Sequence, residues 1–136
     1  MDFTIAKQED RENFIPELVS MDMRMLMNFE NAIYIMMDRL NPEYSGGSWD
    51  FITMPNGAKA MVLISDDVVN VPPQPNYFEG DINEFALTYA LNMYVCSHFS
   101  FGEGKGAESV GENFHKLSEA IPEDYQWAGK IFALLD

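Results

Sequence analysis

Few residues of this chain have the types and spacing that catalysis or metal binding requires. The histidines are His98 and His115, and the one cysteine, Cys96, lies two residues before His98. Side chains two residues apart on a helix point in different directions, so Cys96 is better explained as a core residue than as a metal ligand. Ser45 lies in Tyr-Ser-Gly-Gly, not in the strained Gly-x-Ser-x-Gly turn of a hydrolase, which favours a hydroxyl that bonds to local backbone. We therefore predict no catalytic residue, no metal site and no cofactor.

Two glycine-rich segments have part of what a phosphate-binding loop requires. Gly46-Gly47 does not open a helix after a strand and has no lysine nearby. Gly102–Ser109 precedes an expected helix and contains Lys105, but it lacks the P-loop spacing and the strand before it. We interpret this second segment as a flexible connector.

A long amphipathic helix must position the first glycine pair. Ser20 or Asp22 caps this helix, which runs to about Leu40. Apolar residues at steps of three and four predict one buried stripe, made of Leu26, Phe29, Ile33, Met36 and Leu40. Asn41-Pro42 ends the helix, because proline disfavours the α conformation in the residue before it.

The same region is rich in methionine. The chain has ten methionines, and six of them lie between Met21 and Met37. Methionine is unbranched and polarizable, so it fits either a core or an adaptable binding surface. Several of the six fall on the buried stripe, which favours core packing. Met23 and Met27 lie away from the centre of that stripe, and we expect these two to be exposed.

Strands are predicted after the glycine pair. Ser48–Met54 is rich in aromatic and β-branched residues, Pro55-Asn56-Gly57 favours a hairpin turn, and Ala58–Ile64 returns as the second strand. Because Ala58–Ile64 is almost continuously apolar, we expect it to be central in the sheet. Val68–Val71 is a short third strand, and Asn76–Glu79 is an optional fourth at the edge.

Helices are expected in the rest of the chain. Asp81 and Glu84 match a capping box, and the helix that they begin continues to about Phe99. Ala107–Glu119 is a weaker helix, and Pro122 opens the last one.

Strands grouped between helices predict an α+β fold, in which a small antiparallel sheet packs with about four helices. The sheet comprises the hairpin, a third strand and an optional fourth. We interpret residues 1–136 as a single domain. Its first residues, about 12 of them, are expected to be flexible.

The charge of the chain limits its partners. It has 22 acidic and 8 basic residues, a net charge of −14. This charge disfavours direct binding to DNA or to anionic membranes. It favours solubility and permits a basic protein partner. The N-terminus lacks the pattern of a signal peptide, and no apolar run reaches the roughly 18 residues of a membrane span. With a single cysteine as well, we expect a cytoplasmic protein.

One segment carries a recognisable pattern. The run Glu43-Tyr44-Ser45-Gly46-Gly47-Ser48-Trp49 is followed by the Asn56-Gly57 turn. This pattern resembles the ArdB/KlcA antirestriction family. Weaker similarities lie at Ala90-Leu91-Asn92, Phe114-His115-Lys116-Leu117 and Asp136. The chain departs from the family at Ala58-Lys59-Ala60, where the family is often more aromatic, and at Pro72–Pro75.

The resemblance implies a bacterial protein of mobile genetic elements that relieves type I restriction of incoming DNA and is not an enzyme. Its partner would be a type I restriction-modification enzyme or an associated host protein, reached through protein contacts. Because aromatic side chains dominate binding hot spots, the candidate contact residues are Tyr44, Ser45, Gly46, Gly47 and Trp49. The alternative is that Tyr44 and Trp49 only anchor the hairpin to the helix before it.

An acidic DNA mimic that inhibits a DNA-binding enzyme is the alternative function. One duplex turn of about 34 Å presents roughly 20 negative charges. The 22 acids of this chain are instead spread along its whole length. Glu108, Glu112 and Glu119 share one face of an expected helix, but Lys116 lies among them. A compact domain with a radius of gyration of about 14 Å cannot place all its acidic side chains on one face.

Overall fold

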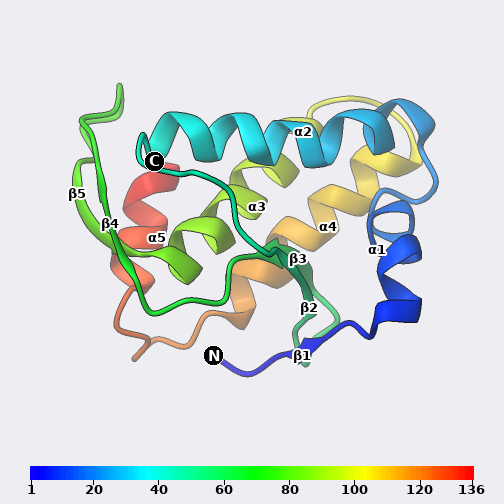
Figure 1. Cartoon of the computed structure of the whole chain (residues 1–136). Coiled ribbons are helices and arrows are strands. Elements are labelled where there is room, and N and C mark those ends of the chain that lie inside the picture. The colour runs from blue at the N-terminus through cyan, green and yellow to red at the C-terminus, as the bar shows by residue number, and fades with distance from the viewer.

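A central helix, α3 (Glu84–Ser100), organises the fold. The computed structural model describes residues 1–136. Eleven of the 17 residues of α3 are buried, because its sequence is apolar on nearly every side. Other helices pack around it, with α2 across one side and α4 and α5 against others (Figure 1). The core therefore forms around a helix and not on one face of a sheet.

The remaining elements form two small sheets and four more helices. In chain order they are β1 (Thr4–Ile5), the 3-10 helix η1 (Gln8–Asp10), α1 (Arg11–Leu18), α2 (Met23–Leu40), β2 (Asp50–Thr53), β3 (Lys59–Val62), β4 (Val68–Val71), β5 (Gly80–Asn83), α4 (Lys105–Ala120) and α5 (Ala128–Leu135). All strand pairs are antiparallel, which confirms the predicted α+β class. None of the helices has both the length and the apolar composition needed to span a membrane.

Helix α2 begins and ends where the sequence predicts. The Asp22 carboxylate accepts a hydrogen bond of 3.1 Å from the Met25 amide, and Asn41-Pro42 follows the last turn. Its buried side chains are Phe29, Ile33, Met37 and Leu40. The sequence predicted Met36 in this stripe, but Met36 is only half-buried and Met37 is buried instead. Phe29, Ile33, Met37 and Leu40 follow one another at steps of four, four and three residues, which keeps them on one side of a helix with 3.6 residues per turn.

The methionines divide between core and surface. The buried ones are Met37, Met54, Met61 and Met93. Met23 and Met27 are 64% and 77% exposed, as predicted. Met21, which precedes the helix, is also exposed.

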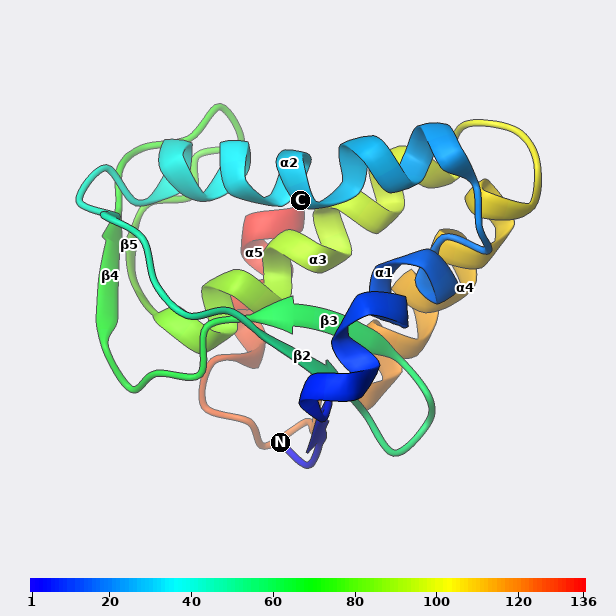
Figure 2. The same ribbon diagram turned by 45° about the vertical axis from the view of Figure 1, so that its right-hand side comes forward.

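The strands form two sheets, and the pairing differs from the simplest expectation. β2 and β3 make the predicted hairpin, and the Asn56 side chain accepts a hydrogen bond from the Ala58 amide in its turn. The strand that extends this hairpin is β1, with Thr4 opposite Thr53. β4 pairs with β5 in a separate sheet, well apart from the hairpin (Figures 1 and 2). β5 begins only at Gly80, so the optional edge strand at Asn76–Glu79 was misplaced.

β3 is an edge strand and not the central strand that its apolar sequence suggested. The order β1-β2-β3 places β2 in the middle. The free edge of β3 instead faces a side-chain amide of α3. Asn92 Oδ1 accepts from the Met61 amide at 2.9 Å, and Asn92 Nδ2 donates to the Met61 carbonyl at 2.7 Å.

Two further side chains complete this edge. Asn113 of α4 makes the same pair of bonds with the backbone of Lys59, both at 2.8 Å. The Thr88 hydroxyl accepts from the Leu63 amide at 3.1 Å. These side chains make the hydrogen bonds to the backbone N–H and C=O groups of β3 that a neighbouring strand would otherwise make. An edge strand can therefore be apolar and buried on this scaffold.

The start of α3 lies two residues later than the capping box predicts. Asn83, not Asp81, is the N-cap, and its Oδ1 accepts from the Ala86 amide at 3.0 Å. Asp81 belongs to β5, where its carboxylate accepts a hydrogen bond from Asn70. Pairing with β4 keeps Asp81 extended, and the helix begins only where that pairing ends.

The last helix also begins later than predicted. Pro122 opens a pair of turns, with Tyr125 N bonded to Pro122 O and Ala128 N bonded to Tyr125 O. These turns pack Tyr125 and Trp127 against the core before α5 starts at Ala128. Ile131 is buried as expected, whereas Phe132 is 41% exposed.

The N-terminal segment contains elements that the sequence did not predict. β1 and η1 precede α1, whose buried residues are Phe14, Ile15 and Leu18. The helix tolerates Pro16 in its interior. The flexibility expected of the first residues stays a prediction.

Candidate functional site

The predicted contact residues form a corner between α2 and β2. Trp49 Nε1 donates a hydrogen bond of 2.8 Å to the Tyr44 hydroxyl, so the two aromatic residues close the loop between them. Trp49 is only 8% exposed, and Tyr44 is half-buried. The Tyr34 ring of α2 meets the Trp49 ring edge-on, with centroids 5.4 Å apart. Tyr44 and Trp49 therefore anchor the loop to the helix, as the structural alternative anticipated.

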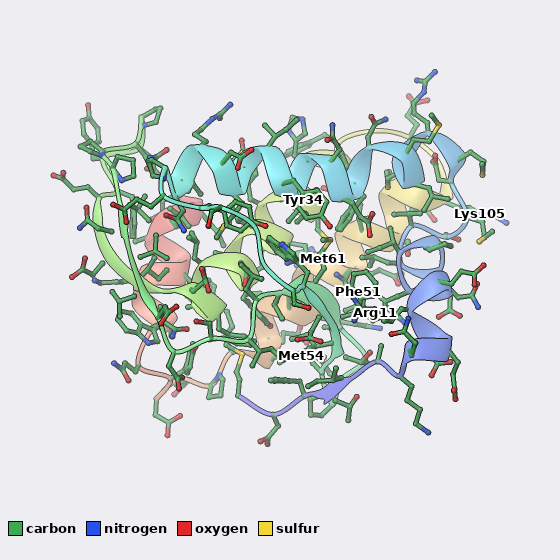
Figure 3. All side chains as sticks on the ribbon, in the orientation of Figure 1. Arg11, Tyr34, Phe51, Met54, Met61 and Lys105 are labelled. Carbon is green, nitrogen blue, oxygen red and sulfur yellow. The ribbon has the colours of Figure 1, made fainter.

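Arg11 of α1 fixes the other side of this corner. Its Nη2 donates to the Trp49 carbonyl at 2.8 Å, and its Nη1 lies 3.8 Å from the Asp50 carboxylate. The guanidinium also lies over the Phe51 ring, 4.7 Å from the centroid. Figure 3 shows Arg11 beside Phe51, on the same side of the molecule as Tyr34. No local pattern predicts this role of Arg11, because Arg11 and Trp49 are 38 residues apart.

Further along α1, Phe14 also makes aromatic contacts with the hairpin. The rings of Phe14 and Phe51 stack with centroids 4.9 Å apart. The Lys59 ammonium lies over the Phe14 ring at 4.7 Å and forms an ion pair with Glu17 at 3.3 Å. Two of the eight basic residues, Arg11 and Lys59, are thus used to hold α1 against the hairpin.

The loop between the two anchors is exposed. Residues 45–48 all face solvent. Gly46 has φ of +105°, a conformation that a residue with a Cβ rarely adopts. A Cβ on Gly47 would lie 3.1 Å from Leu63, so this glycine lets the loop approach β3 closely. Ser45 makes no side-chain hydrogen bond, which corrects the expectation that its hydroxyl bonds local backbone.

One ionisable group of the corner, the Tyr34 phenol, has a shifted pKa. Partial burial, followed by the nearby Glu30 carboxylate, raises the pKa of the Tyr34 phenol above its usual value, while Arg11 opposes this rise. The phenol therefore stays protonated at neutral pH and can donate a hydrogen bond. The corner offers ring faces, phenol hydroxyls and exposed backbone, which are groups common in binding surfaces.

The other chemistry-bearing residues lie elsewhere. Cys96 is buried in α3, as predicted, and burial raises the pKa of its thiol to about 12, although a hydrogen bond from Asn113 opposes the rise. His98 is exposed, with its ring parallel to that of Tyr94 and centroids 6.4 Å apart. His115 meets the Phe114 ring edge-on. The structure brings none of these residues to the corner.

The glycine-rich segment 102–109 runs into the first turns of α4, which pack closely against the residues around the start of α2. A Cβ on Gly106 would lie 2.7 Å from the Asp22 side chain, so only glycine fits there. The Ser109 hydroxyl donates to the Leu18 carbonyl at 2.6 Å. The Asp22 carboxylate thus lies beside the first turn of α4, where a bound phosphate would meet a negative charge.

Comparison with known proteins identifies the fold and its relatives. No family model matches the sequence. The antirestriction protein KlcA of Escherichia coli is 25% identical over 138 aligned positions, which cover 98% of this chain and 92% of KlcA. The chain is homologous to KlcA, of the ArdB/KlcA family. YubI of Escherichia coli (strain K12) is 28% identical over 88 residues, which cover 65% of this chain and 60% of YubI.

The solved structure of the KlcA and ArdB proteins has the same fold as this KlcA homologue. It superposes with a TM-score of 0.81, covers 99% of this chain and 94% of its own, and is 18% identical in sequence. That fold was described as novel, and those proteins show antirestriction activity against type I DNA restriction systems in vivo but not in vitro. The resemblance carried by residues 43–57 is thereby confirmed.

Proposed function

We propose that this chain relieves type I restriction of incoming DNA in the bacterial cytoplasm, as an inhibitor and not as an enzyme. The observation that carries the proposal is its homology to KlcA over 98% of the chain and 92% of the relative. The shared fold, with a TM-score of 0.81, supports the same reading.

The partner is a type I restriction-modification enzyme or a host protein associated with it. KlcA and ArdB act in vivo but not in vitro. An inhibitor that only occupied the DNA site of the enzyme would be expected to act on the purified enzyme as well. This contrast favours a contact that involves another component of the cell.

Protein contact is better supported than DNA mimicry. On α4, the exposed acids run from Glu108 through Glu112 to Glu119, a separation of eleven positions or about 17 Å at 1.5 Å per residue. Duplex DNA presents about ten charges over that length, at one per about 1.7 Å. This helix carries three acids there, and Lys116 lies among them. Its charge density is too low to imitate a duplex.

The proposed contact surface is the exposed loop of the corner. Tyr44 and Trp49 hold the loop, while Ser45, Gly46 and Gly47 present their backbone to solvent. Exposed backbone on a rigid support is a frequent form of binding site, because little entropy is lost when the partner docks.

A phage assay tests the function. Unmodified phage is plated on a strain with an active type I system, with and without the expressed protein. We expect plaque recovery to rise by tenfold or more, while recovery of modified phage and recovery on a strain lacking the nuclease stay unchanged. Unchanged recovery of unmodified phage, with the protein well expressed, would refute the proposal.

A binding assay separates the two mechanisms. Purified protein and purified type I enzyme are mixed over a range of salt concentrations, with and without duplex DNA. Protein contact away from the DNA site predicts no competition by DNA. Salt-sensitive binding that duplex DNA competes away would instead establish the DNA mimic.

A further inference from the structure

The outer face of α2 carries several large apolar side chains, and of these Tyr34 contacts another part of the fold, the Trp49 ring. The buried residues of this helix, Phe29, Ile33, Met37 and Leu40, face the core, where α2 packs on α3 and α1. On the outer face, Met23, Met27 and Tyr34 are 64%, 77% and 37% exposed. Large apolar side chains grouped on one exposed helix face are typical of interaction sites.

These residues belong to a regular seam. Met23, Met27, Glu30, Tyr34 and Asp38 follow one another at steps of four, three, four and four residues. At about 100° per residue they fall within an arc of about 80°. The seam extends over sixteen residues, from Met23 to Asp38, or about 22 Å of helix. We call this set the α2 seam; its spacing is that of anchors that bind another helix.

The charges of the α2 seam are all negative. Glu30 and Asp38 are its charged members, and neither forms an ion pair. The cations of the same helix, Arg24 and Arg39, project about 40° and 100° beyond the edge of the seam, at about 100° per residue. With a net charge of −14 on the whole chain, this face attracts a basic partner.

The α2 seam is continuous with the corner. Tyr34 is a member of the seam, and its ring meets the Trp49 ring with centroids 5.4 Å apart. Tyr34 lies on the side of the molecule that also presents Arg11 and Phe51 (Figure 3). A partner on the corner loop could therefore extend along α2 without crossing another element.

We propose that the α2 seam binds a basic amphipathic helix of the partner protein, an inference that rests on the proposed function. Apolar side chains of that helix contact Met23, Met27 and Tyr34, and its lysines or arginines pair with Glu30 and Asp38. Methionine suits this role, since its flexible side chain adapts to the partner surface. A second copy of the chain is disfavoured because two chains of charge −14 repel each other.

Helix α2 also offers a control position outside the seam. Ile35 is also on α2 and is 52% exposed, but it projects about 60° beyond the edge of the seam at 100° per residue. The variant M23Q/M27Q removes apolar surface from the seam, and I35Q removes exposed apolar surface of the same helix outside it. E30Q/D38N removes the charges and leaves the apolar members in place. All these side chains lie outside the core, so unchanged circular dichroism and thermal midpoint are expected.

The binding probe is a labelled peptide of about 18 residues, long enough to span the seam, with leucine on one helical face and lysine on the other. Fluorescence anisotropy measures its Kd for the wild-type protein and for each variant. We expect binding that weakens with salt, a Kd about tenfold or more higher for M23Q/M27Q, and an unchanged Kd for I35Q. E30Q/D38N should reduce both affinity and salt dependence. In the phage assay, M23Q/M27Q should lose relief and I35Q should keep it.

Several results would overturn the inference. The first is that M23Q/M27Q binds the peptide and relieves restriction as well as the wild-type protein does. The second is that I35Q loses as much affinity and relief as M23Q/M27Q. The third is that a peptide with glutamate in place of lysine binds the wild-type protein equally well. A wild-type dimer in sedimentation velocity that M23Q/M27Q abolishes would assign the face to a second copy instead. If the wild-type protein gives no relief at all, the proposed function is wrong. The peptide Kd values still show whether the α2 seam binds a basic helix, because they do not depend on the phage assay.

Discussion

The indole of Trp49 and the hydroxyl of Tyr44 are joined by a hydrogen bond of 2.8 Å that closes an exposed loop of four residues. The bond ties two ends of a segment whose interior has few other restraints. Arg11, bonded to the Trp49 carbonyl, links the same point to α1. The loop is therefore held at its base by aromatic and cationic contacts and is exposed to solvent at its tip.

Replacing Tyr44 by Phe should lower the free energy of unfolding by about 1 kcal/mol, because the part-buried Trp49 N–H loses its partner. Trp49→Phe removes the other partner while keeping an aromatic ring, and both variants should fold. The double variant should cost less than the sum of the two, with a coupling of about 0.5–1.5 kcal/mol in urea denaturation. Additive costs would show that the bond contributes nothing.

The same two variants test the surface assignment. If the corner loop contacts the partner, changing its anchors should reduce recovery of unmodified phage while expression stays near wild type and the variants remain folded at the assay temperature. Full relief by both Tyr44→Phe and Trp49→Phe would show that the loop is only structural.

Replacing Asn92 by Leu should lower the free energy of unfolding by about 2–5 kcal/mol, since the buried N–H and C=O of Met61 would each lose a partner. The matched control is Asn31→Leu, at an exposed position of α2 where the side chain makes no hydrogen bond. Its cost should stay within about 0.5 kcal/mol. Equal costs in urea denaturation would contradict the role assigned to Asn92 at the edge of β3.

Gly46→Ala should destabilise the protein by about 1–2 kcal/mol, because alanine is strained at the φ of +105° found there. Gly129→Ala is the control, since Gly129 lies in α5 with open space around its Cα. There alanine should stabilise the helix by about 0.5 kcal/mol. Thermal denaturation of the two variants should therefore shift in opposite directions, and shifts of the same sign would contradict the assignment.

Stability should fall in alkali partly through Cys96. Burial raises the pKa of its thiol from 9.0 to about 12, so the folded protein holds this proton more tightly than the unfolded chain. The contribution is complete below about pH 9 and is lost as the pH rises from 9 towards 12. Urea denaturation from pH 8 to pH 10.5 should therefore show a shallower decline for Cys96→Ala than for wild type. Parallel declines would contradict this account.

The local pattern of the sequence predicted some elements well. Asp22 and Pro42 bound α2 because capping and proline act within one turn of the chain. Asn56-Gly57 marked the hairpin for the same reason, since a tight turn is encoded by its own residues.

What the sequence could not predict depends on partners far along the chain. The two residues of β1 are too few to carry a pattern, and they pair with residues 47 or more positions away. Asn92 and Asn113 looked like ordinary helical residues, although they complete the edge of β3. Arg11 likewise reaches the corner only through the packing of α1.

The most direct test of the central claim is the plating efficiency of unmodified phage on a strain with an active type I system. Expression of the wild-type protein should raise plaque recovery by tenfold or more, towards the value on a strain without the nuclease. Recovery that stays at the restricted level, while the folded protein is present in quantity, would contradict the claim that this chain relieves type I restriction.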